Sequence, residues 1–181
     1  SFTFDSLSPR HQRAAVVAGA QPSEDARLRA LHRYGVLDTE AEEAFDRITA
    51  LAARLLDVPI ALVSLIDRDR QWFKSCVGLD VEGTPRSDSF CAHAIEQPGV
   101  MVVEDARDDA RFADNPLVTG PPHIRFYAGA PLPVAGGHRL GTLCIIDREP
   151  RTLSPSSSSP ALAYSSQGFS ASSPFSRSTS L

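Results

Sequence analysis

The sequence predicts an α+β fold, an α/β sandwich in which a central sheet is covered on both faces, and three observations support it. An apolar run over residues 59–66 is followed, after a charged corner, by a mixed run over 71–77. Branched apolar and aromatic residues favour strands, so this pair is predicted to be a hairpin. A late apolar run over 140–147 ends at an aspartate, as the early run does, and predicts another strand of the same sheet. A helical period over 40–57 supplies a helix to cover that sheet.

The N-terminal elements are predicted from local signals for the starts and ends of helices. Residues 1–22 mix Ser, Pro, Gly and small apolar residues without a sustained period, which predicts a loosely ordered leader. Ser23 is placed to cap a helix over 24–34. Thr39 and Glu42 have the spacing of a capping box and predict the start of the second helix. That helix is expected to lay one apolar stripe on the sheet, formed by Phe45, Ile48, Leu51, Ala52, Leu55 and Leu56.

The second half of the chain is predicted from shorter signals. After the hairpin, residues 78–86 are expected to be a loop, and Ser87 or Asp88 to start a short helix that runs to residue 95. The connection over 105–122 contains acids and prolines with few apolar residues, which is typical of a lid or a binding segment. Further strands are predicted over 101–103, 124–132 and 140–147. Serine supplies 13 of the 28 residues of 154–181, so this tail is predicted to be disordered.

Composition excludes several classes of function. A net charge of −4 weighs against nucleic acid and anionic lipid as partners, because both attract basic surfaces. No run approaches the roughly 20 apolar residues that span a bilayer, so no membrane segment is predicted and the cytoplasm is the expected compartment. Cys76, Cys91 and Cys144 are odd in number and form no C-x-x-C motif. They are therefore predicted to be free thiols, without a disulfide framework or a zinc site.

Eight short blocks occur in order along the chain, at residues 34–38, 45–49, 64–67, 70–75, 89–95, 111–118, 124–131 and 141–147. Together they resemble a GAF domain, of the branch found in bacterial sensor histidine kinases and diguanylate cyclases. The resemblance assigns residues 23–153 to this domain. It implies a central antiparallel sheet of five to six strands, with helices on one face and a ligand pocket on the other. The pocket would be roofed by 86–95 and 106–123, and the closing helix usual in the family is replaced by the serine-rich tail.

The resemblance implies a sensory or regulatory module that binds a small molecule and is not an enzyme. No output domain is expected on this chain. The expected partner is therefore a histidine kinase or diguanylate cyclase domain of a two-component or related system, in cis or in trans. The module is also expected to form a homodimer. Members bind small molecules, tetrapyrroles or redox cofactors, and the cofactor here stays unknown. Lys74 precedes Asn115, which breaks the cyclic-nucleotide signature, and Ala92 separates Cys91 from His93, unlike the adjacent pair of bilin-binding members.

The residues predicted to line the pocket are Phe73, Ser75, Cys91, His93, Phe112, Arg125, Phe126 and Tyr127. Aromatic side chains with an arginine and a histidine suit a planar or anionic ligand, and the competing interpretation is ordinary sheet packing. Strand alternation predicts that Phe73 and Ser75 share one face.

Two alternatives stay open beside the sensory module. A pocketless dimerisation domain would fill its cavity with bulky side chains. A thiol-dependent enzyme of the free methionine sulfoxide reductase type would need Cys91 and His93 to act together, and residues two apart share a face in an extended segment but not in a helix. Loss of thiol-dependent turnover in Cys91→Ser would identify the enzyme.

Overall fold

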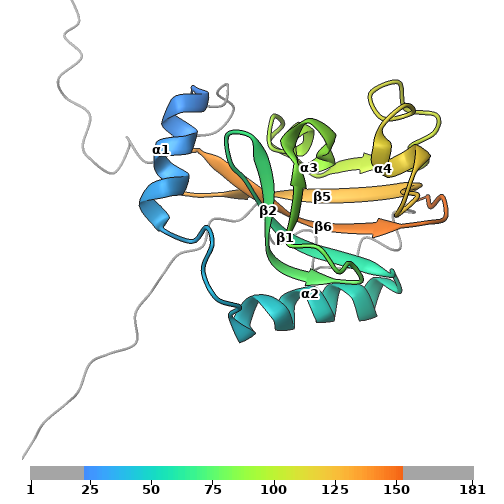
Figure 1. The fold of residues 1–181 in the computed structure, drawn as a ribbon, viewed down its shortest axis with the longest axis horizontal. Helices are drawn as coiled ribbons and strands as arrows, with labels where there is room; N and C mark the ends of the chain where they lie inside the picture. The colour runs from blue at the N-terminus through green and yellow to red at the C-terminus, as the bar shows by residue number, and fades with distance from the viewer. Residues whose placement is uncertain (1–22, 153–181) are drawn as a thin grey trace, which may run out of the picture.

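The computed structural model describes residues 23–152, so the predicted leader 1–22 and tail 154–181 lie outside the described residues. Its centre is a six-stranded sheet in the order β3-β2-β1-β6-β5-β4, in which all neighbours are antiparallel (Figure 1). The strands are β1 Ile60–Ile66, β2 Arg70–Val77, β3 Gly83–Pro85, β4 Met101–Val103, β5 Phe126–Pro133 and β6 Arg139–Asp147. The predicted α+β architecture with its antiparallel sheet is confirmed.

The two long helices match the sequence prediction with one difference at a start. Helix α1, Glu24–Tyr34, has the predicted bounds, although the side chain of Ser23 makes no capping hydrogen bond. Helix α2, Glu43–Leu56, begins later than predicted. The hydroxyl of Thr39 donates to the carbonyl of Val36 and accepts from Lys74 instead of closing a capping box. Glu42, the residue before α2, is extended.

Short elements account for most of the differences from prediction. Strand β3 and the 3-10 helix η1, Arg86–Asp88, occupy the end of the predicted loop and the residues beyond it. Helix α3, Phe90–Ala94, is capped by Ser89, whose hydroxyl accepts from the amide of Ala92, and not by Ser87 or Asp88. Helix α4, Pro116–Thr119, lies in the connection predicted to be irregular, with Asn115 as its cap. Such one-turn elements carry too few residues for a period to be recognised.

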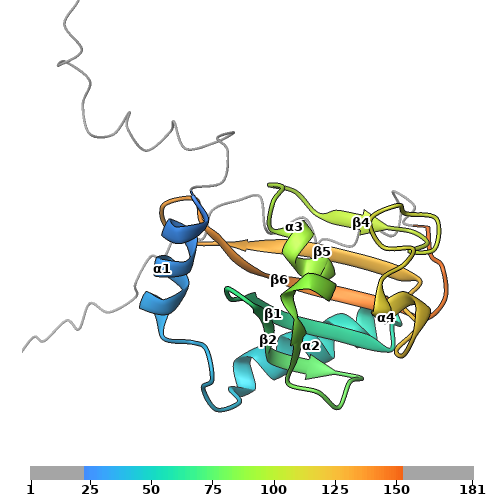
Figure 2. The same ribbon diagram turned by 45° about the horizontal axis from the view of Figure 1, so that its top comes forward.

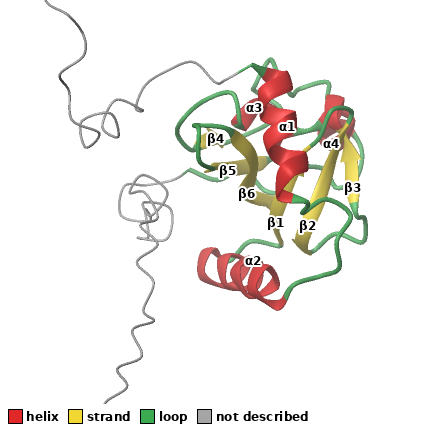
Figure 3. Ribbon diagram, turned by 90° about the vertical axis from the view of Figure 1, so that its left-hand side faces the viewer, coloured by secondary structure: helices red, strands yellow, loops and turns green. Residues whose placement is uncertain are grey.

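The sheet separates two different layers (Figures 2 and 3). Of the helices in the described residues, α2 alone covers one face, while α3, α4 and the irregular segment 104–125 lie on the other. Helix α1 packs at one end of the sheet, where Leu31 clusters with Leu65 and Leu140. None of the helices in the described part of the chain is long and apolar enough to cross a membrane.

Half of the predicted apolar stripe of α2 faces away from the sheet, whereas Phe45, Ala52 and Leu56 are partly buried. Thr49 and Ala53 are buried against the sheet, whereas the side chains of Ile48, Leu51 and Leu55 are exposed by 46%, 57% and 61%. The small side chains suit this face because the sheet surface beneath is already filled by residues such as Phe126. Amphipathic periodicity identified the helix but not which of its apolar sides lies inside.

Candidate ligand pocket

A cavity of about 310 Å³ lies between the sheet and the segments opposite α2. The sheet contributes Leu62, Gln71, Phe73, Tyr127 and Ile146. The edge strand β3 contributes 83–85, and the roof and rim contribute residues 79–81, Phe90, Cys91, Leu117, 121–122 and Ile124. This volume is at the lower end of the usual range for small-molecule sites, about 300–1,000 Å³, so the cavity suits a small ligand.

The lining is mostly apolar, although it includes Asp80, and at one end hydrogen bonds converge on the sulfur of Cys91. The amide nitrogen of Gln71 lies 3.2 Å from this sulfur and the hydroxyl of Tyr127 lies 3.3 Å from it, both in donating positions. Gln71 is oriented in turn by the hydroxyl of Thr84, which is 3.4 Å from its amide oxygen. The cavity can therefore hold an apolar molecule with a single polar group directed at this end.

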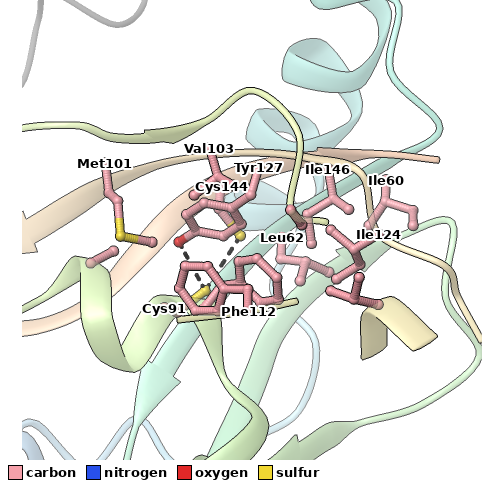
Figure 4. Close-up of a cluster of buried hydrophobic side chains, with 14 of the residues drawn as sticks. Ile60, Leu62, Cys91, Met101, Val103, Phe112, Ile124, Tyr127, Cys144 and Ile146 are labelled. Atoms are coloured by element: carbon pink, nitrogen blue, oxygen red, sulfur yellow. Dashed lines mark hydrogen bonds between the residues drawn. The ribbon is translucent and has the colours of Figure 1, made fainter. Parts of the chain in front are cut away.

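The sulfur of Cys144 lies 3.6 Å from the sulfur of Cys91, behind the cavity wall (Figure 4). Cys91 comes from α3 and Cys144 from β6, and both are buried free thiols. In the close-up the ring of Tyr127 lies beside the two sulfurs, with its hydroxyl directed at Cys91. The fold thus brings together two cysteines that are far apart in sequence.

The position of the Tyr127 ring depends on a glycine in the same strand. A β-carbon on Gly129 would stand 2.1 Å from the hydroxyl oxygen of Tyr127, closer than any real contact. Residues two apart in a strand share a face, so the absence of a side chain at Gly129 gives the phenol room to lie along β5. The tyrosine hydroxyl reaches Cys91 for this reason.

The two cysteines differ in acidity. Burial alone raises the pKa of the Cys91 thiol, but hydrogen bonds from Cys144, Ser64, Thr142 and Tyr127 outweigh it and lower this pKa to about 6. The hydrogen bond to Cys91, together with burial, raises the pKa of Cys144 well above its ordinary value. One proton shared between the sulfurs explains both directions, because Cys144 then donates to a Cys91 thiolate.

Three of the predicted pocket residues, Phe73, Cys91 and Tyr127, line the cavity. Phe112 lies one layer behind it, with its ring stacked on that of Phe90 at 3.9 Å between centroids. His93 contacts the edge of the Phe112 ring and faces an outer groove away from the cavity. Helix α3 therefore turns Cys91 and His93 to different sides, and the structure does not bring them together as a dyad.

The remaining predicted residues lie away from the cavity. Ser75 donates to the carboxylate of Asp46 on the α2 side, where Phe126 is also buried. The guanidinium of Arg125 is held by backbone carbonyls of 118 and 124. Among the described residues, no Arg, Lys or His side chain lines the cavity, so its chemistry does not match the anionic ligand that the sequence suggested.

A β-bulge explains the misplaced serine. Val63 pairs with Ser75 and the next residue, Ser64, pairs with Phe73, so Lys74 is the extra residue. The bulge puts Lys74 and Ser75 on the same side and reverses the alternation beyond it. The shared face predicted for Phe73 and Ser75 was therefore wrong. Gln71, which the prediction missed, keeps the alternation with Phe73 and faces the cavity.

Within the described range 23–152, no group of three or more His, Cys, Asp and Glu side chains is arranged to hold a metal ion.

Comparison with known proteins fits this architecture. A family model for the GAF domain matches residues 40–160, two thirds of the chain. The chain belongs to the GAF domain family. This GAF domain is 53% identical over 128 residues to a cyclic di-GMP phosphodiesterase of Pseudomonas aeruginosa, a match that covers 71% of this chain and 22% of that protein. The match thus spans about a fifth of the length of the curated relative.

Solved structures show the same fold at low sequence identity. The GAF domain of a phosphoenolpyruvate-protein phosphotransferase from Coxiella burnetii has a TM-score of 0.56 at 14% identity, over 77% of this chain and 86% of that one. A free methionine-R-sulfoxide reductase from Neisseria meningitidis, solved with its substrate, has a TM-score of 0.54 at 16% identity, over 82% and 90%. At these identities the likeness concerns the fold.

Proposed function

We propose that this GAF domain is the sensory module of a cytoplasmic signalling protein and that it binds a small, largely apolar molecule in the cavity above the sheet. The observation that carries the proposal is the cavity itself, whose lining is mostly apolar, with a polar end at Gln71, Cys91 and Tyr127 and with Asp80 as its charged residue. The output domain would be a phosphodiesterase, diguanylate cyclase or histidine kinase, in cis or in trans. The similarity to a cyclic di-GMP phosphodiesterase supports this class of partner.

A hydrogen-bonded connection from the roof to the N-terminal helix supports a signalling role. Arg86 lies at the start of the segment that leads into α3, and its guanidinium donates to Glu24 of α1 at 2.5 Å and to the carbonyl of Asp67. The buried Arg27 of α1 donates to the same Glu24 and to the carbonyl of Ile66 at the end of β1. A ligand that favours one position of the roof would shift α1 through these contacts.

Thermal unfolding of the full chain tests the pocket. The probes are indole, 2-phenyl-2-propanol and octan-1-ol, which combine an apolar body with one uncharged polar group. A ligand at 100 times its dissociation constant stabilises the folded state by about 2.7 kcal/mol, so a matching probe raises the melting temperature in a concentration-dependent way. The substitution Leu117→Trp, which places an indole in the cavity, is expected to abolish that rise.

The matched control is Val102→Trp, because Val102 is a partly exposed residue that does not line the cavity. This variant is expected to keep the response of the unmodified protein. An equal response in both tryptophan variants would show that the probes bind elsewhere and would contradict the proposal. The absence of any response to the three probes would contradict the apolar ligand class.

Pairing of two copies is a second candidate role, because α2 exposes Ile48, Leu51 and Leu55 on one side. Their spacing of three and four residues forms the narrow apolar stripe with which helices pair. This role is compatible with ligand binding, since the stripe and the cavity lie on opposite faces of the sheet. The thiol enzyme based on Cys91 and His93 is less supported, because α3 directs the two side chains to different sides.

A further inference from the structure

Reversible binding of a ligand gives a role to Cys91, which lines the cavity, but none to Cys144 beside it. Cys91 lines the cavity, whereas Cys144 lies behind it and does not reach the lining. Their sulfurs are 3.6 Å apart, and Gln71 and Tyr127 are among the other groups that donate to the sulfur of Cys91. A thiol open to a cavity and backed by a second thiol is the arrangement in which oxidation of the first is resolved by the second.

We propose that Cys91 and Cys144 form a dithiol site that reduces an organic hydroperoxide bound in the cavity and closes to a disulfide. Cys91 is the residue that reacts with the oxidant, and Cys144 is the resolving residue. The inference rests on the proposed function, because the hydroperoxide must enter the same cavity as the ligand.

The reaction balances in two steps. The sulfur of Cys91 attacks the terminal oxygen of the hydroperoxide, so that an S–O bond forms as the O–O bond breaks, and the alcohol leaves with the proton of the Cys91 thiol. The sulfur of Cys144 then attacks the Cys91 sulfenic acid, the S–S bond forms, and water leaves with the proton of Cys144. The two sulfurs lose two electrons and the hydroperoxide gains them.

The surroundings favour the first step at Cys91. The amide of Gln71 and the hydroxyl of Tyr127 donate to its sulfur and stabilise the thiolate, which is the nucleophilic form. The acidity of the thiol agrees, since its pKa lies at about 6. The third cysteine, Cys76, is half-buried, its sulfur contacts the carbonyl of Leu79, and burial raises its pKa. Cys76 therefore serves as the internal control.

The apolar lining favours an organic hydroperoxide over hydrogen peroxide. Leu62, Phe73, Phe90 and Ile146 surround the approach to Cys91, and an apolar group that contacts them gains affinity from burial. A disulfide would join α3, which roofs the cavity, to β6 of the sheet. Oxidation would thus fix the roof through a covalent bond, and reduction by an added dithiol would release it.

The test treats the reduced full chain with cumene hydroperoxide and, separately, with hydrogen peroxide, and follows the peptides of Cys91 and Cys144 by mass spectrometry. The expected product is a Cys91–Cys144 disulfide that has lost two hydrogen atoms and forms at least about tenfold faster with cumene hydroperoxide. In Cys144→Ser the reaction is expected to stop at a Cys91 sulfenic acid that dimedone traps. Cys91→Ser is expected to lose both products, and Cys76→Ser to react at the rate of the unmodified protein.

Several results would contradict the proposed dithiol site. Oxidation of Cys144 at an unchanged rate in Cys91→Ser, or a disulfide that involves Cys76, would overturn the assignment. Equal rates with the two oxidants would overturn the choice of an organic substrate. Circular dichroism verifies that each serine variant is folded, and alanine at the same position replaces any that is not.

The pH dependence of oxidation distinguishes a chemical role of Tyr127 from a purely structural one. Tyr127→Phe keeps the ring but removes a donor to the Cys91 thiolate, so the pH at which oxidation reaches half its maximal rate is expected to move upward. An unchanged pH profile would show that the hydroxyl of Tyr127 does not stabilise the Cys91 thiolate.

The unreactive alcohol 2-phenyl-2-propanol separates this inference from the proposed function. A rise in melting temperature with the alcohol, but no disulfide with cumene hydroperoxide, would leave the pocket standing and overturn the dithiol site. A lack of both responses would count against the pocket as well.

Discussion

The two faces of the sheet are covered in different ways, and this difference explains where the cavity lies. On one face, the continuous helix α2 lies directly on the sheet, with Ala53 among the buried residues at the contact. On the other face, short helices and irregular chain rest on large side chains such as Phe73 and Tyr127. The small inward side chains of α2 allow this helix to lie close to the sheet, so little space remains between the helix and the sheet. A roof assembled from several short pieces does not lie flat on the sheet and can enclose a cavity.

The largest expected effect comes from removing the aromatic contact that fixes the roof. Phe112 belongs to the irregular roof segment, is buried, and stacks on Phe90 of α3. Truncation of a buried phenylalanine leaves a void that costs about 3–5 kcal/mol. Phe112→Ala is therefore expected to lower the free energy of unfolding by that amount in urea titrations.

The control for this variant is Leu51→Ala on the outer side of α2. Leu51 is an apolar residue whose side chain is exposed, so its truncation is expected to change the free energy of unfolding by less than about 0.5 kcal/mol. A small effect of Phe112→Ala, similar to that of the control, would mean that the roof is not part of the cooperative core.

A smaller effect is expected at Gly129 of β5, which lies against the ring of Tyr127. The methyl group of Gly129→Ala would overlap the hydroxyl of Tyr127, and the flexible end of that ring must move. Overpacking of this kind costs about 1–3 kcal/mol, and the displaced hydroxyl no longer stabilises the Cys91 thiolate. Urea unfolding and a thiol titration are expected to show lower stability and a raised pKa of Cys91. Gly99→Ala, where nothing lies within 4 Å of the added methyl, is the matched control and should change neither quantity.

The fold was predictable from the sequence because its long elements carry their own periods. Helix α1 has its predicted bounds, and the strands β1, β2, β4 and β6 differ from the predicted ranges by at most one residue at each end. Strand β5 begins two residues late, since Ile124 and Arg125 belong to the roof. Apart from β4, the elements of three to five residues were missed or displaced, because one turn of helix or one short strand has too few positions to show a pattern.

The site was less predictable because it depends on contacts between distant residues. Cys91 and Cys144 are separated by 53 positions and form no motif, so only the fold could bring their sulfurs together. The bulge at Lys74 reversed the alternation that was used to assign Ser75. Gln71 could have been found, since it stands two residues before Phe73 on the same strand, but its role depends on the sulfur it contacts.

A modest effect is expected from the ion pairs that connect the roof with α1. Hydrogen bonds from Arg27 in particular, and from Arg86, lower the pKa of Glu24 from 4.5 to about 2, although partial burial opposes them. A lowered carboxyl pKa adds stability that is complete above about pH 4.5 and is lost as the pH falls toward 2. Because the Glu24 side chain is 45% exposed, we expect Glu24→Gln to cost no more than about 1 kcal/mol at neutral pH.

Urea midpoints measured from pH 7 to pH 2 test the role of Glu24. The difference between Glu24→Gln and the unmodified protein is expected to shrink as the pH falls through this window. The exposed Glu43 of α2 provides the matched substitution, and Glu43→Gln is expected to leave the midpoints nearly unchanged. A difference for Glu24→Gln that stays constant down to pH 2 would show that its carboxylate charge contributes nothing to the connection.

The smallest effect on folding is expected on the outer side of α2, where the effect on association should be greatest. Leu51 and Leu55 are exposed in the single chain, so the double substitution Leu51→Glu with Leu55→Glu should change the free energy of unfolding by no more than about 0.5 kcal/mol. If two copies pair along this stripe, light scattering should give twice the 19.5 kDa mass of one chain, and the double variant should return it to that of one chain. Burial of apolar area favours pairing, and two carboxylates on each facing helix oppose it through desolvation and repulsion. A doubled mass that persists in the double variant would place the contact elsewhere and would leave the stripe on α2 without a partner.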